Sequence, residues 1–100
     1  MTLIAADGVR TPDPDPATIE AAVRGLSIDN WFVILEESDD TFLQVAVKPD
    51  SYALERRAGG DATHVGAEVA TIDEVVEAFQ AYGRHDPAWT FRFSWSPVKL

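Results

Sequence analysis

The central part of the chain consists of four short segments separated by turn sequences, and this spacing restricts the fold more than any other feature. The segments are WFVILEE (31–37), TFLQVAVK (41–48), SYALERR (51–57) and ATHVGAEV (62–69). The sequences between them, ESDD, KPDS and AGGD, are rich in residues that form tight turns. Segments of this length joined by tight turns predict a meander of four β-strands. In the third strand, Tyr52, Leu54 and Arg56 would share one face, which favours a sheet covered on one side and solvated on the other.

Two further segments have the apolar periodicity of helices. Residues 16–26 follow Asp15, a good N-cap residue, and begin with a proline at the first helical position. Residues 72–82 follow Thr71, which forms a T-x-x-E capping box with Glu74. Gly83 is a plausible C-cap of this second helix, since a proline four positions later prevents its continuation.

These elements predict an α+β fold. We expect a single domain with an antiparallel sheet of four to six short strands and two helices packed on one face. The core is assigned to residues 16–95. Residues 1–15 are expected to form an extended N-terminal segment, stiffened by the prolines of TPDPDP (11–16). Within this segment, TLIAA (2–6) could add an edge strand.

The aromatic segment HDPAWTFRFSW (85–95) follows the second helix. The strict alternation from residue 91 to residue 95 is typical of a half-buried strand, with Phe91 and Phe93 in the core. Tryptophan is often only partly buried, so Trp89 and Trp95 are the candidates for exposed anchors of a binding surface.

The chain is strongly acidic, with seventeen Asp and Glu residues, eight Lys and Arg residues and a formal net charge of -9. Such a field disfavours nucleic acid and anionic membranes and attracts a basic partner, although it is also explained by solubility alone. The absence of cysteine excludes disulfides and thiolate metal sites. No segment approaches the ~18 consecutive apolar residues of a membrane span. The N-terminus lacks the pattern of a signal peptide, so a cytoplasmic location is expected.

No catalytic motif is evident in the sequence. The two histidines, His64 and His85, lack metal-binding spacing, although a site that combines them with Asp61 or Asp86 stays open as an alternative. The paired glycines lie in a turn between strands and not before a helix, so no cofactor is expected. The adjacent acids Glu36, Glu37, Asp39 and Asp40 are explained either as solvated turn charge or as an acidic patch that meets a basic protein.

Two long stretches of the chain resemble known sequences. TIDEVVEAFQAYGRHDPAWTFRFSW (71–95) contains a D-E-V-V-E-A-F helix that leads into a final F-x-W, and FVILEESDDTFLQVAVKPDSYALERR (32–57) contains V-I-L-E, F-L-Q and Y-x-L-E-x-R strands. Together they resemble a group of small, mostly actinobacterial, uncharacterised proteins that are similar to immunity proteins of polymorphic-toxin systems. The resemblance covers most of residues 16–95. It implies a stoichiometric inhibitor that occupies a toxin's active site.

The sequence therefore favours a protein-binding module without catalytic activity, most concretely an immunity-type inhibitor of a basic toxin domain. Its expected contact residues are the acids Glu36, Glu37, Asp39 and Asp40 and the aromatics Trp89 and Trp95. The alternative is a small ligand-binding domain or enzyme with a pocket between the sheet and the helices. A homodimer formed through a sheet edge or the aromatic tail is a third hypothesis.

Overall fold

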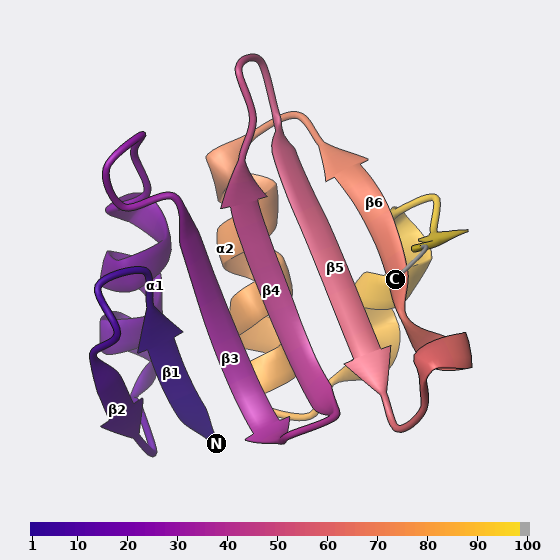
Figure 1. Cartoon of the computed structure of the whole chain (residues 1–100), viewed down its shortest axis with the longest axis horizontal. Helices are drawn as coiled ribbons and strands as arrows, with labels where there is room; N and C mark the ends of the chain where they lie inside the picture. The colour runs from indigo at the N-terminus through magenta and orange to yellow at the C-terminus, as the bar shows by residue number, and fades with distance from the viewer. Residues whose placement is uncertain (99–100) are drawn as a thin grey trace.

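The computed structural model describes residues 1–98, and of Asp61 only the backbone. Seven strands form one sheet in the order β2-β1-β3-β4-β5-β6-β7, and all neighbouring strands are antiparallel (Figure 1). Their bounds are β1 (Thr2–Ala5), β2 (Arg10–Pro12), β3 (Phe32–Ser38), β4 (Thr41–Val47), β5 (Tyr52–Ala58), β6 (Val65–Val69) and β7 (Ser96–Pro97). The α+β class and the four-stranded central meander are confirmed. The sheet has more strands than the four to six expected, because both ends of the chain add to it.

The helices are α1 (Pro16–Arg24) and α2 (Ile72–Gly83), with short 3-10 segments η1 (Asp61–Thr63) and η2 (Pro87–Arg92). Both α-helices lie behind the sheet in the view of Figure 1, on one face, as predicted. The predicted N-caps are confirmed, since Asp15 accepts a hydrogen bond from the Thr18 N–H and Thr71 accepts one from the Glu74 N–H. Gly83 is the last residue of α2, and the C-cap position is one residue later than expected.

The N-terminal residues belong to the sheet. β1 and β2 form a hairpin, and β1 pairs with β3 in a register that sets Leu3 opposite Leu35. Leu3 is only 5% exposed and contributes to the core. β1 is therefore an interior strand and not the edge strand that the sequence suggested, because β2 folds back against it and takes the edge position.

The core lies between the sheet and the two helices. It is formed by alternate residues of the central strands together with the apolar face of α2. Among its members, Leu35, Leu43, Leu54, Val75 and Phe79 are fully buried. Every second strand residue is used for this packing, so the residues between them point to the opposite face of the sheet.

The aromatic segment after α2 does not form the strand predicted over residues 91–95. Asp86 accepts a hydrogen bond from the Ala88 N–H and Pro87 follows it, so these two residues start the 3-10 segment η2. As a result Phe91 is 89% exposed, whereas the alternation predicted it in the core. Phe93 does pack against the core, and strand pairing resumes only at Ser96.

Candidate functional site: the uncovered face of the sheet

In the described part of the chain, no helix covers the second face of the sheet, which is turned towards the viewer in Figure 1. We call this surface the open face. The strand registers assign to it the following residues: Thr2, Ile4, Phe32, Ile34, Glu36, Phe42, Gln44, Ala46, Ala53, Glu55, Arg57, Gly66 and Glu68. Antiparallel sheets that are solvated on one side usually carry polar residues there. The open face departs from that rule, since Ile4, Ile34, Phe32 and Phe42 form an apolar centre of half-buried side chains over three adjacent strands.

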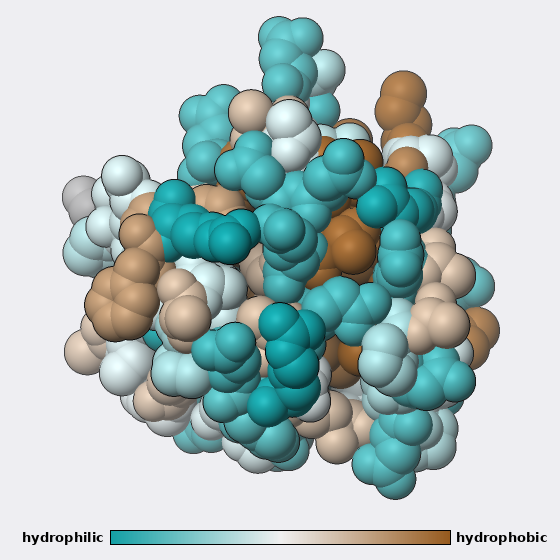
Figure 2. Space-filling model, turned by 180° about the vertical axis from the view of Figure 1, so that it is seen from behind, coloured by the Kyte–Doolittle hydropathy of each residue, from teal (hydrophilic) through white to brown (hydrophobic). Residues whose placement is uncertain are grey.

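The surface on the other side of the molecule is different. Figure 2 shows the helix-bearing side, where hydrophilic side chains dominate the centre, hydrophobic atoms lie in gaps between them, and a few hydrophobic side chains project at the periphery. An amphipathic helix produces this distribution, because its apolar stripe faces the core and its polar face meets water. The apolar centre of the open face has no such cover.

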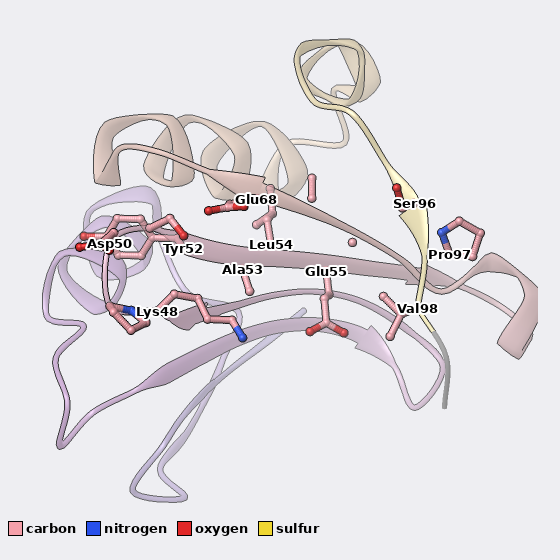
Figure 3. Close-up of a pocket in the computed structure, with 14 residues that line it drawn as sticks. Lys48, Asp50, Tyr52, Ala53, Leu54, Glu55, Glu68, Ser96, Pro97 and Val98 are labelled. Carbon is pink, nitrogen blue, oxygen red and sulfur yellow. The ribbon is translucent and has the colours of Figure 1, made fainter.

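A groove of about 570 Å³ lies over β5 and β6, and none of the four residues of the apolar centre lines it (Figure 3). The turn from Lys48 to Ser51 borders the groove at one end and residues 96–98 border it at the other. Figure 3 shows Lys48, Ala53 and Glu55 on the side of the sheet away from the helices. A Cβ atom at Gly66 would lie 3.1 Å from Val98 Cγ2, so the groove exists partly because this position has no side chain.

His64 lies beside the groove and is only 7% exposed. Its Nε2 lies 2.8 Å from Oε1 of Glu55, and the Phe42 ring meets its ring edge-on at a centroid distance of 5.7 Å. Its Nδ1 is buried without a hydrogen-bond partner among the described residues. His64 therefore fixes the position of Glu55 on the open face.

His85 belongs to a different part of the molecule. It follows α2 with the left-handed φ of 59°, and its Nδ1 is 3.2 Å from Oε1 of Glu37. Each histidine thus has its own carboxylate partner, Glu55 for His64 and Glu37 for His85. Among the described side chains, no group of three or more His, Asp or Glu residues is placed to hold a metal ion.

The four acids predicted as contact residues do not form one patch. Glu36 lies on the open face, where its carboxylate is 3.1 Å from the Arg10 guanidinium. Glu37 points to the other face, towards His85. Asp39 and Asp40 are exposed in the β3–β4 turn, where Asp40 accepts a hydrogen bond from the Ser38 hydroxyl. Strand alternation separates the first pair, and the turn holds the second.

The tryptophans are placed differently from the expectation. Trp89 is only 7% exposed and is therefore no exposed anchor. Trp95 is half-buried, donates its indole N–H to the Thr90 carbonyl, and carries the Arg56 guanidinium over its ring. The exposed tryptophan is Trp31, at 54%, which sequence reasoning assigned to the start of a strand. The one sign of this exposure in the sequence is that Trp31 directly follows Asn30, at the start of a strand. A side chain at a strand end is not covered by the side chains of neighbouring strands.

A smaller hollow, of about 210 Å³, lies between the sheet and the end of α2. Tyr82, Arg56 and His85 are among the residues that line it. The Tyr82 hydroxyl is buried and has no hydrogen-bond partner among the described residues. Burial, and secondarily the negative charge of Glu37, raise the pKa of Tyr82 to about 12.

The chain matches no protein-family model, no curated protein and no solved structure. Over residues 1–98, none of the helices has the length and apolar character needed to cross a membrane.

Proposed function

We propose that the protein is a non-catalytic protein-binding module and that a partner protein covers its open face. The observation that carries this proposal is the apolar centre formed by Ile4, Phe32, Ile34 and Phe42 on a sheet face without helical cover. Apolar surface that is contiguous and has a polar border marks interaction sites more often than isolated apolar residues do. Glu36 with Arg10 and Glu55 with His64 supply that polar border.

The charge of the chain favours a basic partner. At a net charge of -9, two copies of this protein repel each other, whereas a basic protein is attracted and its association is accelerated. Homodimerisation through the open face is for this reason the weaker hypothesis. Within the class of basic partners, we propose a toxin domain that this protein inhibits, in line with the sequence resemblance to immunity proteins.

The hollow beside Tyr82 is the candidate for the alternative function, binding of a small ligand between sheet and helices. Its 210 Å³ is smaller than the ~300–1,000 Å³ of ligand pockets in general. A second hollow between the sheet and the helices, lined by Ile19, Leu35 and Gln80 among others, measures about 450 Å³, and the groove on the open face measures about 570 Å³. Pocket size therefore does not decide between the two functions, and the apolar centre of the open face is what favours protein binding.

The test uses affinity purification from the source cell with the wild-type chain and two matched variants. Ile34→Lys places a charge in the apolar centre of the open face, and Phe91→Lys places the same charge on an exposed aromatic of η2. We expect a basic protein to be retained by the wild type and by Phe91→Lys and to be lost from Ile34→Lys. Circular dichroism checks that both variants are folded.

The inhibitor role has its own readout. The captured protein is expressed alone and together with the wild-type chain, and growth is compared. We expect growth arrest by the partner alone and rescue on co-expression. Equal retention by Ile34→Lys and the wild type would refute the open face as the binding surface, and a captured protein without toxicity would refute the inhibitor role.

A further inference from the structure

The connection between α1 and β3 presents two large apolar side chains to solvent. We call residues 25–31, with the sequence GLSIDNW, the braced loop. Within it Ile28 is 89% exposed and Trp31 is 54% exposed. The two side chains lie in one short connection, whereas Phe91 is exposed alone on η2, and apolar side chains exposed together mark interaction sites more often than isolated ones do.

Hydrogen bonds hold the braced loop in one conformation. The Ser27 N–H donates to the Asn30 carbonyl at 3.0 Å, and the Asn30 N–H donates back to the Ser27 hydroxyl at 3.1 Å. The Asn30 side-chain amide also donates to the Gly25 carbonyl, at 3.1 Å. Because the backbone is fixed in this way, little further entropy is lost when a partner binds Ile28, and such pre-organisation increases affinity.

The braced loop is continuous with the open face. The Trp31 ring stacks on the Phe32 ring with centroids 4.7 Å apart and an interplanar angle of 15°. The Trp31 carbonyl accepts a hydrogen bond from the Val47 N–H at 2.9 Å, which ties the end of the loop to β4. A partner that covers the apolar centre would therefore reach Trp31 without leaving the surface.

The charged residues near the loop indicate the chemistry of the partner. Asp29 is exposed between Ile28 and Asn30, and Asp7 is exposed in the β1–β2 turn, at the same end of the sheet (Figure 1). Val9, 58% exposed, follows in that turn. Apolar side chains flanked by carboxylates are complementary to an apolar pocket with a basic border.

We propose that the braced loop is the anchor of the interface: Ile28 and Trp31 insert into an apolar pocket of the partner that carries Lys or Arg opposite Asp29. This inference rests on the proposed protein-binding function and names the part of the surface that contributes most to affinity. Tryptophan is among the residues that dominate binding when they become buried at the centre of an interface.

The test is a selection of random peptides displayed on phage against four immobilised full-length proteins. These are the wild type, the double variant Ile28→Ser/Trp31→Ser, the open-face variant Ile34→Lys, and Phe91→Ser as the control. Phe91 is a suitable control because it is equally exposed, at 89%, but lies on η2. Peptides enriched on the wild type should combine apolar residues with Lys or Arg. Their affinity should fall by about tenfold or more for the double variant and stay unchanged for Phe91→Ser.

A further variant separates the anchor side chains from the bracing. Asn30→Ala keeps Ile28 and Trp31 but removes the bond to the Gly25 carbonyl, and we expect it to weaken peptide binding several-fold. If the double variant bound the peptides as tightly as the wild type, the anchor role of Ile28 and Trp31 would be overturned. If Ile34→Lys lost peptide affinity in the same experiment, the proposed protein-binding function of the open face would still stand. A wild-type chain that enriches no basic, apolar peptides would overturn both.

Discussion

The buried hydroxyl of Tyr82 leads to a prediction that runs against the usual effect of removing a polar group. The hydroxyl has no hydrogen-bond partner among the described residues, and the ring contacts the Trp89 ring edge-on. Tyr82→Phe keeps the ring and removes only the unpaired oxygen. Leaving a buried polar group unpaired costs about 1–3 kcal/mol, so we expect the variant to be more stable by about 1 kcal/mol at pH 7 after some loss of packing.

The pH dependence supplies a second signature of the same hydroxyl. Burial raises the pKa of Tyr82 from 10.0 to about 12 in the folded protein. The unfolded chain therefore loses the Tyr82 proton first, and wild-type stability falls as the pH rises from 10 towards 12. The full shift corresponds to about 3 kcal/mol, which solvent screening around a partly exposed side chain reduces to about 1–2 kcal/mol. In Tyr82→Phe this contribution to the alkaline loss should be absent.

The assay is urea unfolding and thermal unfolding, both followed by circular dichroism, at pH 7 and at several values between pH 10 and pH 12. Tyr52→Phe serves as the control, since Tyr52 is a half-buried tyrosine of β5. We expect Tyr82→Phe to raise the Tm by about 4–8 °C at pH 7. A variant that is less stable than the wild type by about 1 kcal/mol or more would show that the hydroxyl has a partner, and the reasoning would be refuted.

Two further predictions concern the stability of the fold. The first compares two phenylalanines that the sequence pattern placed in the core, and the second concerns the N-cap residue of α1. Phe79→Ala should lower the free energy of unfolding by about 3–5 kcal/mol because Phe79 is fully buried. Phe91→Ser should change it by less than about 0.5 kcal/mol because Phe91 is exposed. Urea unfolding of both variants tests this, and equal losses would contradict the placement of η2. Hydrogen bonds from the side chain and backbone of Thr18 lower the pKa of Asp15, so Asp15 stabilises the fold above its ordinary pKa and less as the pH falls through its lowered value. Asp15→Ala should therefore lower the Tm at pH 7 and flatten the acid limb of the stability profile, and an unchanged thermal melt would count against the cap.

The elements that were predictable from sequence are those determined by local interactions. The turns after residues 37, 48 and 58 delimit β3, β4 and β5 closely, since turn residues act within a few positions. The caps at Asp15 and Thr71 are equally local. The place of β1 between β2 and β3 was not predictable. Strand pairing is a long-range interaction, and which strands pair depends on the apolar residues that the pairing buries.

The segment after α2 has the alternation of a strand, but the strand predicted from it does not form. Alternation from Phe91 to Trp95 fits a strand, yet Asp86 and Pro87 start a 3-10 turn and override it. The expected acidic patch failed for a different reason. Successive residues of a strand point to opposite faces, so the alternation of β3 itself separates Glu36 from Glu37. The exposure of Trp31 depends on where the neighbouring strands end, and its position after Asn30 is the one local sign of it in the sequence.

The order of strands in the sheet has a consequence for how the chain folds. β4, β5 and β6 each pair with the strand before them in sequence, so these three pairings close short loops at low entropic cost. The N-terminal hairpin pairs with β3 across α1, and β7 returns to β6 only after α2 and η2. We therefore expect the four central strands to assemble first and both ends of the chain to dock afterwards. The braced loop, which joins α1 to β3, would then acquire its fixed form late, when the N-terminal hairpin closes on the growing sheet.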